Sequence, residues 1–209
     1  MENLIPKGVA NKVLSVFNLL SKLIALKKIN PNIITISGIP INILGGYLYS
    51  KGYVQIAGLI VLLASFTDIL DGQVAKLLKK ESKFGSVFDS TLDRYSEIII
   101  FTGLILFFIK RSENLYSFLT FLALTGSIMV SYVKARAEGA GIPISGGFFK
   151  RAERIILLSV CSILGIDVLK IFLYIITFTT HLTAVQRLIL VYKKERIETL
   201  NRKEEQWEK

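Results

Sequence analysis

Six apolar segments, each close to the length at which a helix crosses a lipid bilayer, constrain this chain more than any other feature. A bilayer core of ~30 Å needs about 20 helical residues, and the sequence of 209 residues is 52% hydrophobic. Such a composition is too apolar for an ordinary soluble domain. We therefore predict an all-α integral membrane protein with six transmembrane helices, near residues 33–50, 53–70, 87–109, 115–133, 152–166 and 168–191.

The segment before the first span has a different pattern. Between residues 7 and 28, apolar side chains recur at helical spacing while most polar ones fall on the opposite face, which is typical of an amphipathic helix lying in the membrane interface. Pro31 ends that helix, and Asn32 is expected to cap the first span. We predict three regions: an N-terminal interfacial helix in residues 1–30, a six-helix transmembrane domain that holds the candidate site in 31–193, and a charged tail in 194–209.

The net charge of the chain is +10. Its basic residues lie at the ends of apolar segments instead of alternating with aromatic ones, so we expect anionic lipid head groups as partners and no nucleic acid. Lys and Arg are few in three connectors and abundant in the others and in both tails. By the positive-inside rule the richer side is cytoplasmic. We expect a multi-pass protein of the cell (plasma) membrane with both termini in the cytoplasm. The connectors with few basic residues carry Lys51, Lys110, Arg111 and Lys170.

Two pairs of aspartates stand at the edges of neighbouring apolar segments. Asp68 and Asp71 are three residues apart, and Asp89 and Asp93 are four apart. Each pair therefore lies on one face of a helix, and the polar residues 79–85 can turn the chain back and bring all four carboxylates together. Unpartnered carboxylates would repel one another, whereas hard cations such as Mg²⁺, Mn²⁺ or Ca²⁺ favour oxygen ligands. The spacing predicts a metal site at the cytoplasmic ends of the second and third spans.

Small residues accompany these acids. Gly72, Ala75 and Gly85 leave space beside the acids for a bulky ligand. Together the acids and the small residues resemble the signature of the CDP-alcohol phosphatidyltransferases, D-x2-D-G-x2-A-R-x8-G-x3-D-x3-D, with every gap kept. One position departs from the signature, because Lys76 stands where the family has Arg. Lysine keeps the charge but lacks the planar fork that suits phosphate oxygens.

The resemblance implies an enzyme that transfers a phosphatidyl-type group from a CDP-linked lipid, either CDP-diacylglycerol or CDP-archaeol, to a polar alcohol and releases CMP. It implies a pair of Mg²⁺ or Mn²⁺ ions held by the four aspartates, of which Asp93 would also act as the general base. It further implies a homodimer. The residues that it assigns to the CDP group are Asn32, Thr35, Gly72, Ala75, Lys76 and Gly85.

A second group of charges lies close to the last three spans, in SYVKARAEG (residues 131–139), in RAERII (residues 151–156) and at Arg187. Such charges usually line a cavity or a site, with Glu138 or Glu153 as internal partners, and positive-inside anchoring is the alternative. The two segments resemble the branch of the family that makes phosphatidylinositol phosphate, or its archaeal ether-lipid equivalent, from inositol phosphate. By that resemblance the acceptor phosphate is held by Lys134, Arg154 and Arg187, with Arg136 and Arg151 as further candidates.

The residues leave two other functions open. Short basic segments also occur in relatives that use glycerol 3-phosphate, so the same chemistry with that or another polar alcohol is the first alternative. A divalent-cation transporter is the second, since acids in membrane spans can mark ion paths. The four acids gather at one membrane face, and the sequence has no inverted repeat. A transporter would also leave the small residues unexplained, so the transferase is favoured.

Overall fold

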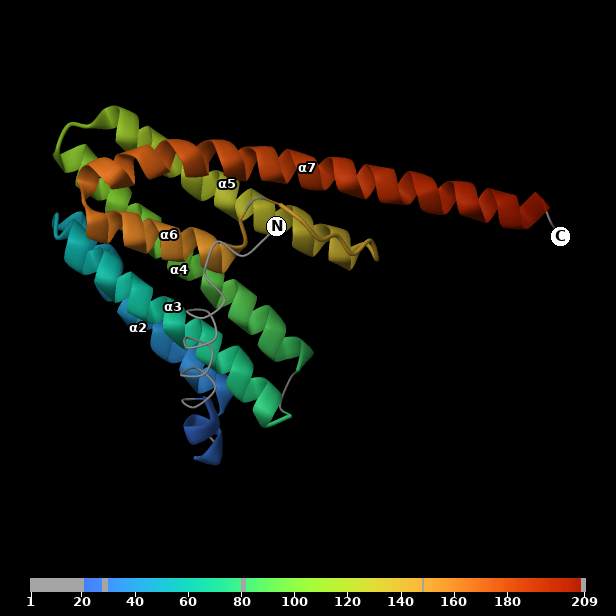
Figure 1. The fold of residues 1–209 in the computed structure, drawn as a ribbon, viewed down its shortest axis with the longest axis horizontal. Helices are drawn as coiled ribbons and strands as arrows, with labels where there is room; N and C mark the ends of the chain where they lie inside the picture. The colour runs from blue at the N-terminus through green and yellow to red at the C-terminus, as the bar shows by residue number, and fades with distance from the viewer. Residues whose placement is uncertain (1–20, 28–29, 80–81, 148, 208–209) are drawn as a thin grey trace, which may run out of the picture.

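A computed structural model describes residues 21–27, 30–79, 82–147 and 149–207 of the chain (Figure 1). Every regular element in these residues is a helix, which confirms the predicted all-α class. A short helical segment at residues 21–26 precedes the first long helix. The long helices of the described residues are α2 (Pro31–Ser50), α3 (Val54–Leu77), α4 (Lys83–Lys110), α5 (Asn114–Gly139), α6 (Arg151–Leu164) and α7 (Ile166–Trp207).

The starts of α2 and α4 are fixed by side-chain caps. The side chain of Asn30 accepts a hydrogen bond of 3.0 Å from the backbone N–H of Asn32, so Asn30 is the cap and Pro31 is the first helical residue. The prediction that Asn32 caps this helix is therefore wrong. Proline suits the first helical position because that position has no intrahelical use for an N–H. In α4, Ser82 Oγ accepts a hydrogen bond of 2.9 Å from the N–H of Gly85.

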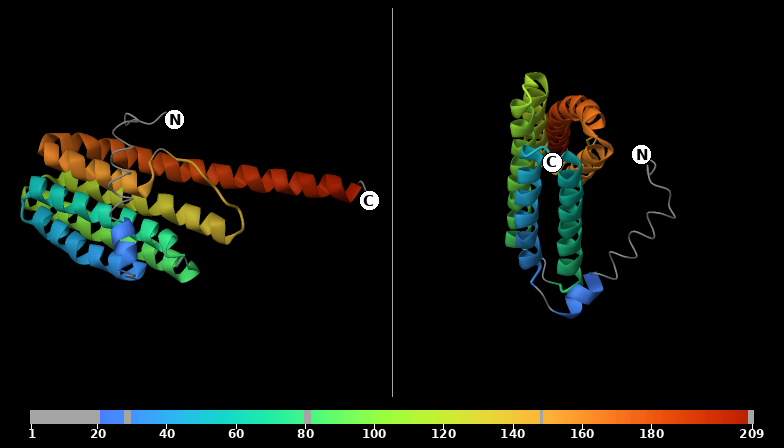
Figure 2. Two further views of the ribbon diagram at one scale, coloured as in Figure 1. Left: turned by 60° about the horizontal axis from the view of Figure 1, so that its bottom comes forward. Right: turned by 90° about the vertical axis from the view of Figure 1, so that its left-hand side faces the viewer.

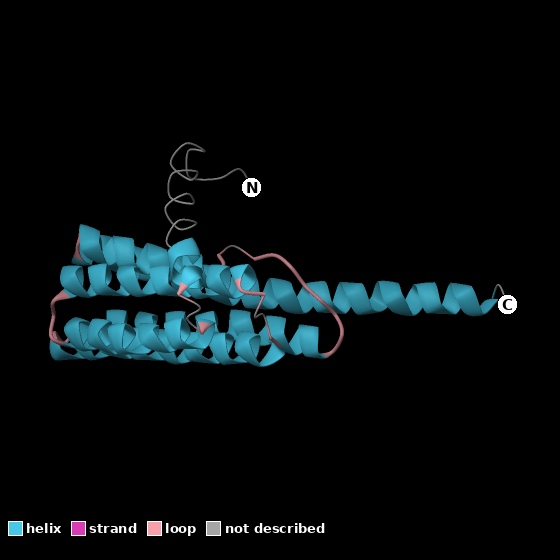
Figure 3. Cartoon of the chain, turned by 90° about the horizontal axis from the view of Figure 1, so that it is seen from below, coloured by secondary structure: helices cyan, strands magenta, loops and turns pink. Residues whose placement is uncertain are grey.

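The long helices pack in two layers (Figures 2 and 3). One layer contains α2, α4 and α5, and the other contains α3, α6 and α7, as the colours of Figure 2 show. The layers meet at two edges, where α2 packs against α3 and α5 packs against α7, so each helix has two main neighbours. Residues 140–150 connect α5 to α6 by the longest loop drawn, and α7 extends well past the other helices (Figures 1 and 3).

In the described part of the chain, four helices are long and apolar enough to cross a membrane, namely α2, α3, α5 and α7. The other two differ for separate reasons. α4 has 28 residues but carries the charges of Asp93, Arg94 and Glu97. α6 has 14 residues, which corresponds to about 21 Å at 1.5 Å per residue. The chain is a multi-helix membrane protein, and the crossing of the bilayer by all six helices stays a prediction.

The predicted outer regions are only partly visible. Most of the predicted interfacial helix in residues 1–30 lies outside the described residues. At the other end, α7 runs without a break from Ile166 to Trp207. The predicted boundary at residue 194 is therefore no change in secondary structure, because the Lys, Glu and Arg residues that follow it are good helix formers.

The apolar core fills the half of the bundle that contains the α2–α3 and α4–α5 turns. Helices approach closely there because small residues lie between them. A Cβ atom on Gly103 of α4, for example, would lie 2.1 Å from the carbonyl oxygen of Gly46 on α2. The other half of the bundle holds the buried charges. Fully buried members of the core include Phe101, Leu104, Phe108, Leu169 and Leu173.

Candidate active site

Two of the four predicted aspartates meet on one arginine. Nη1 of Arg151, at the start of α6, donates a hydrogen bond of 3.0 Å to Asp68 Oδ2 on α3 and forms an ion pair with Asp93 Oδ1 on α4. Nη2 of Arg151 also donates to the backbone carbonyl of Asp93 at 3.1 Å. Since α3 and α6 lie in one layer and α4 in the other, this arginine joins the two layers beside the acids.

The other two predicted ligands lie on the same helices. Asp89 is half-buried one turn before Asp93, where its carboxylate is repelled by Asp68 and attracted by Arg151. Asp71 lies in α3, but its side chain is not among those described. Among the described side chains, no group of three Asp, Glu, His or Cys residues is close enough to hold a metal ion. The complete four-aspartate site therefore stays a prediction.

The donor chemistry of this region nevertheless fits a divalent cation. Carboxylate oxygens are the ligands that Mg²⁺ and Mn²⁺ prefer. The position between Asp68 and Asp93 already holds a cationic group, the guanidinium of Arg151. Carboxylates that hold a guanidinium between them create the negative potential that a metal cation requires.

The small residues of the signature leave space beside the acids. A Cβ atom on Gly72 would meet no other atom within 4 Å. A Cβ atom on Gly85, across the α3–α4 turn, would come within 3.6 Å of Asn32 Oδ1. The structure thus brings Asn32 of α2 beside Gly85 of α4, and their contact with CDP stays a prediction. Of the remaining residues predicted for CDP, Thr35 is buried, Ala75 is half-buried and Lys76 is exposed.

Arg154, which was predicted to hold the acceptor phosphate, is buried in a network between the two layers. Its Nη2 donates to Glu97 Oε1 at 3.2 Å, and its Nε donates to Ser127 Oγ at 2.7 Å. The Ser127 hydroxyl donates to the same Glu97 oxygen at 2.8 Å. Glu97 Oε2 accepts a hydrogen bond of 3.1 Å from Arg94 Nη1, which also contacts Ser131 Oγ. We call Arg94, Glu97, Ser127 and Arg154 the inner charge network.

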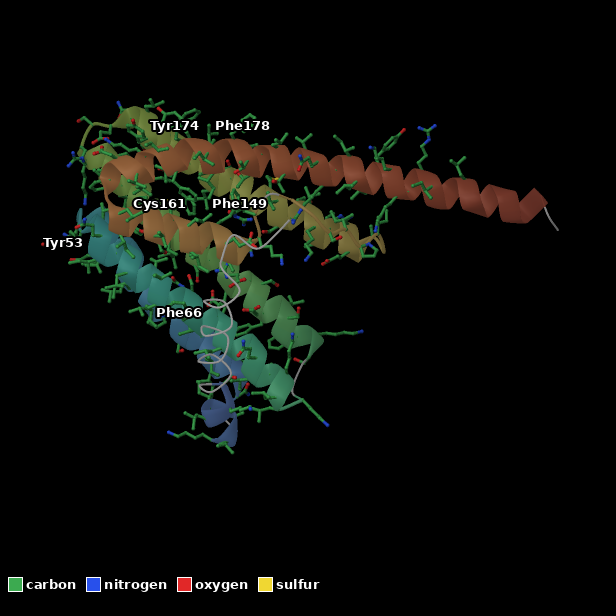
Figure 4. The ribbon with its side chains drawn as sticks, viewed as in Figure 1. Tyr53, Phe66, Phe149, Cys161, Tyr174 and Phe178 are labelled. Atoms are coloured by element: carbon green, nitrogen blue, oxygen red, sulfur yellow. The ribbon has the colours of Figure 1, made fainter. Side chains whose placement is uncertain are left out.

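Two arginines fix the loop between α5 and α6. Nη2 and Nε of Arg187 on α7 donate to the carbonyl of Gly146 at 2.9 and 3.1 Å, and its Nη1 donates to the carbonyl of Val130 at 2.5 Å. Nη1 of Arg154 donates to the carbonyl of Phe149 at 3.2 Å, just before α6 begins (Figure 4). The loop is therefore held at Gly146 and at Phe149 by two residues that were predicted to bind phosphate.

The five basic residues predicted for the acceptor phosphate thus have different surroundings. Arg151 pairs with the aspartates. Arg154 of α6 belongs to the inner charge network and also bonds to the loop, and Arg187 of α7 bonds to the loop. Lys134 and Arg136 are exposed on α5, where Lys134 Nζ lies 3.6 Å from Glu138 Oε1. A single pocket that contains all five residues stays a prediction.

Sequence reasoning missed the centre of the inner charge network. Glu97 follows Asp93 by four residues and Asp89 by eight, a spacing that puts all three on one face of α4. The rule that selected the two aspartates would have selected Glu97 as well. Its partners Ser127 and Arg154 are 30 and 57 residues away along the chain, and no local pattern links them to it.

Known proteins share both the sequence and the fold of this chain. The chain is 38% identical over 181 residues to the archaetidylinositol phosphate synthase of Pyrococcus horikoshii. The matched region covers 86% of this chain and 91% of that protein. The crystal structure of Mycobacterium tuberculosis phosphatidylinositol phosphate synthase with CDP-DAG bound is similar with a TM-score of 0.77 at 26% identity, covering 85% of this chain and 94% of that one. The same enzyme in complex with manganese and citrate also gives a TM-score of 0.77 at 26% identity, covering 84% and 88%.

The family signature extends over most of the chain. The family profile described as CDP-alcohol phosphatidyltransferase matches residues 28–187, a range that contains the four aspartates, the small residues between them and the inner charge network. The fold, the signature and the profile agree. The chain therefore belongs to the CDP-alcohol phosphatidyltransferase family and is an enzyme of that class.

Proposed function

We propose that this enzyme transfers a phosphatidyl-type group, a diacyl- or dialkylglycerol phosphate, from a CDP-linked lipid to a hydroxyl of inositol phosphate and releases CMP. The observation that carries the proposal is the ion pairing of Asp68 and Asp93 with Arg151, next to the buried pair of Glu97 and Arg154. Carboxylates for a metal-bound diphosphate thus lie beside cations suited to a phosphorylated acceptor. The names of the similar synthases support inositol phosphate as that acceptor.

The donor would bind at the aspartate end of α3 and α4. Mg²⁺ or Mn²⁺ ions, in our proposal a pair, would be held by the four aspartates of the signature. When bound, such ions neutralise the charge on the diphosphate and on the leaving CMP. The open space at Gly72 would let the nucleotide approach the backbone of α3, and Gly85 with Asn32 would contact its other side. The relative's complexes with CDP-DAG and with manganese support this assignment.

The transfer itself needs a proton acceptor close to the attacking hydroxyl. The oxygen of that hydroxyl bonds to the lipid-side phosphorus, and the bond from this phosphorus to the bridging oxygen of the diphosphate breaks. CMP leaves with the bridging oxygen. Asp93 would take the proton of the hydroxyl, and this position beside the reacting atoms makes it the catalytic residue of the proposal.

The acceptor would bind where α6 begins. Charge-assisted hydrogen bonds from an arginine fork suit phosphate oxygens. Of the five basic residues predicted for the acceptor, Arg151 is the one that pairs with the described aspartates. Arg154 and Arg187 would add positive charge from within the bundle while they hold the loop. Lys134 and Arg136 would act from the exposed side of α5. An acceptor without a phosphate would gain no charge-assisted contact from these cations.

We further propose that the active site and both termini face the cytoplasm and that two copies of the chain form a homodimer. The positive-inside rule supports this orientation, because Lys79, Lys83, Lys150 and Lys194 lie at the end of the bundle that carries the aspartates. A cytoplasmic site would receive its water-soluble acceptor without a crossing of the membrane. CDP-diacylglycerol and CDP-archaeol both present the diphosphate that the site requires.

One comparison of acceptors tests the proposal. Purified enzyme is given CDP-diacylglycerol or CDP-archaeol with Mg²⁺ and either inositol phosphate, glycerol 3-phosphate or free inositol, and CMP release is measured. We expect release with inositol phosphate and little with free inositol, which lacks the phosphate. Release with glycerol 3-phosphate alone would overturn the acceptor assignment. Metal uptake into liposomes without any CMP release would favour a transporter instead.

A further inference from the structure

Glu97 is a fully buried carboxylate that the transfer chemistry does not use directly. It is 0% exposed and lies on the same face of α4 as Asp93, one turn farther from the α3–α4 turn. Its two oxygens accept hydrogen bonds from Ser127 Oγ at 2.8 Å, Arg154 Nη2 at 3.2 Å and Arg94 Nη1 at 3.1 Å. These three donors come from three different helices, so Glu97 connects α4, α5 and α6.

Stability alone does not account for such a residue. A charge inside a membrane bundle is expensive even when it is paired. Apolar side chains of similar volume often replace a buried ion pair without loss of stability, whereas removal of one partner is strongly destabilising. We therefore ask which groups the Glu97 carboxylate holds in place, and these are the guanidinium groups of Arg94 and Arg154.

The first route from Glu97 to the reacting end runs through Arg94. This arginine precedes Glu97 by three residues and donates to its Oε2 through Nη1. Its other nitrogen, Nη2, lies 3.7 Å from Asp93 Oδ2. The guanidinium thus lies between the two carboxylates of α4. Any movement of the Glu97 side chain changes the position of a cation that faces Asp93.

The second route runs through Arg154 and α6. Arg154 Nη2 pairs with Glu97, and Nη1 donates to the carbonyl of Phe149. Phe149 stands two residues before Arg151, whose guanidinium pairs with the other oxygen of the Asp93 carboxylate. Arg154 is 1% exposed and makes four hydrogen bonds, so it has little freedom to move. Glu97 therefore helps to set the start of α6 and the arginine that it carries.

We propose that Glu97 is a positioning residue for the transfer reaction, in which its buried carboxylate fixes Arg94 and Arg154 and thereby holds Asp93 between two cations. The proposal rests on the proposed function, because that function makes Asp93 the proton acceptor. Misplacement of a reacting group by about 1 Å can lower the rate on the order of 100-fold. Loss of the Glu97 charge should therefore act mainly on kcat, with a smaller effect on acceptor binding through Arg151 and Arg154.

Three variants test this role. Glu97→Gln keeps the size and removes the charge, Glu97→Asp keeps the charge at a shorter reach, and Ser127→Ala removes only the hydroxyl that joins Glu97 to Arg154. CMP release is measured against acceptor concentration at a temperature well below each melting temperature. We expect Glu97→Gln to lower kcat by about 10- to 100-fold with KM for the acceptor changed less than about 3-fold. Glu97→Asp should recover part of the loss, and Ser127→Ala should lose a few-fold.

Ser159→Ala is the matched control. Ser159 is also fully buried, on α6, but among the described residues its hydroxyl bonds only to the carbonyl of Ile155 in its own helix, at 2.8 Å. It should keep the kcat of the wild type. A folded Glu97→Gln variant with normal kcat, or with a loss confined to KM, would overturn the proposal. If that variant does not fold, Ser127→Ala decides, and equal kcat values for Ser127→Ala and Ser159→Ala would then refute the role of Glu97.

The outcome is separable from that of the proposed function. The variants are assayed with whichever phosphorylated alcohol supports CMP release in the wild type, so a wrong acceptor does not affect the ratio of kcat values. Failure of inositol phosphate in the wild type overturns the acceptor. An unchanged kcat in a folded Glu97→Gln variant overturns the positioning role alone.

Discussion

Two glutamates at opposite ends of the bundle each bind two cations, in very different surroundings. In the inner charge network, the side chains of Glu97 and Arg154 are 0% and 2% exposed. At the other end, Glu113 accepts a hydrogen bond of 2.8 Å from Arg111 Nε and pairs with Lys170. The side chains of Glu113 and Arg111 are 19% and 53% exposed. We call Arg111, Glu113 and Lys170 the far-end cluster.

The difference in burial changes what each cluster can do. Near water, an ion pair gains little, typically about 0–1 kcal/mol, because solvent screens it and the side chains lose entropy. Inside the bundle the same pairing is costly to form and costlier to break. The far-end cluster therefore joins the α4–α5 turn to α7 and does no more, whereas the inner charge network determines where charged groups lie beside the aspartates. We therefore expect substitutions in the inner charge network to lower turnover and similar substitutions in the far-end cluster to leave it unchanged.

The largest expected effect is at Asp93. Asp93→Asn keeps the shape of the side chain but removes the proton acceptor and a proposed metal ligand, so CMP release should fall by at least about 100-fold. Glu113→Gln, the same kind of change in the far-end cluster, should leave turnover within about 2-fold because nothing in that cluster contacts the aspartates. Steady-state CMP release by the two purified variants measures both. Near-normal turnover of Asp93→Asn would refute the role of Asp93 in the transfer reaction.

The aspartate end could be predicted from the sequence because its information is local. Asp68 and Asp93 lie within one signature, and the spacing of each pair is a helical one that can be read without a structure. The apolar segments likewise predicted every long helix of the described residues, because a bilayer sets both their composition and their length. The residues that form this end of the bundle are therefore the residues of the sequence signature.

The inner charge network could not be predicted, because its information is spread over three helices. In the sequence, nothing distinguishes Ser127 from other small polar residues of an apolar segment. Its role is evident only from the packing of α5 beside Glu97. Arg154 was selected for its charge and assigned to a phosphate, and only the packing of α6 shows that Ser127, Glu97 and the loop accept its hydrogen bonds. The cap of α2 was misassigned for a simpler reason, because Asn30 and Asn32 flank Pro31 and either could accept a backbone hydrogen bond.

A smaller effect is expected at Arg151. Its substitution should lower the melting temperature in a way that Mg²⁺ reverses, whereas a substitution in the far-end cluster should not. Arg151→Gln removes the cation between Asp68 and Asp93, so the aspartates repel one another. In the presence of a chelator the melting temperature should fall by about 5 °C, from a loss of about 2 kcal/mol in a partly exposed pair. Saturating Mg²⁺ should restore most of that loss, since a divalent cation can neutralise the same carboxylates.

Arg111→Gln is the control for this experiment. It removes a cation from the far-end cluster, where no signature aspartate lies, so its melting temperature should respond to Mg²⁺ as the wild type does. Melting curves of the three proteins in detergent, with and without Mg²⁺, give the comparison. An equal response of the two variants to Mg²⁺ would contradict the assignment of the cation site to the aspartate end.

The smallest effect is expected at Glu113 and depends on pH. Hydrogen bonds from Arg111 and Lys170 hold the pKa of Glu113 below its ordinary value of 4.5. A carboxylate with a lowered pKa in the folded state stabilises the fold above its unfolded pKa, and this contribution is lost as the pH falls through the folded pKa. Glu113→Gln should therefore melt about 1–3 °C below the wild type at neutral pH, and the difference should shrink in acid and at high salt. A difference that persists in acid would contradict the assignment of this stabilisation to the charge of Glu113.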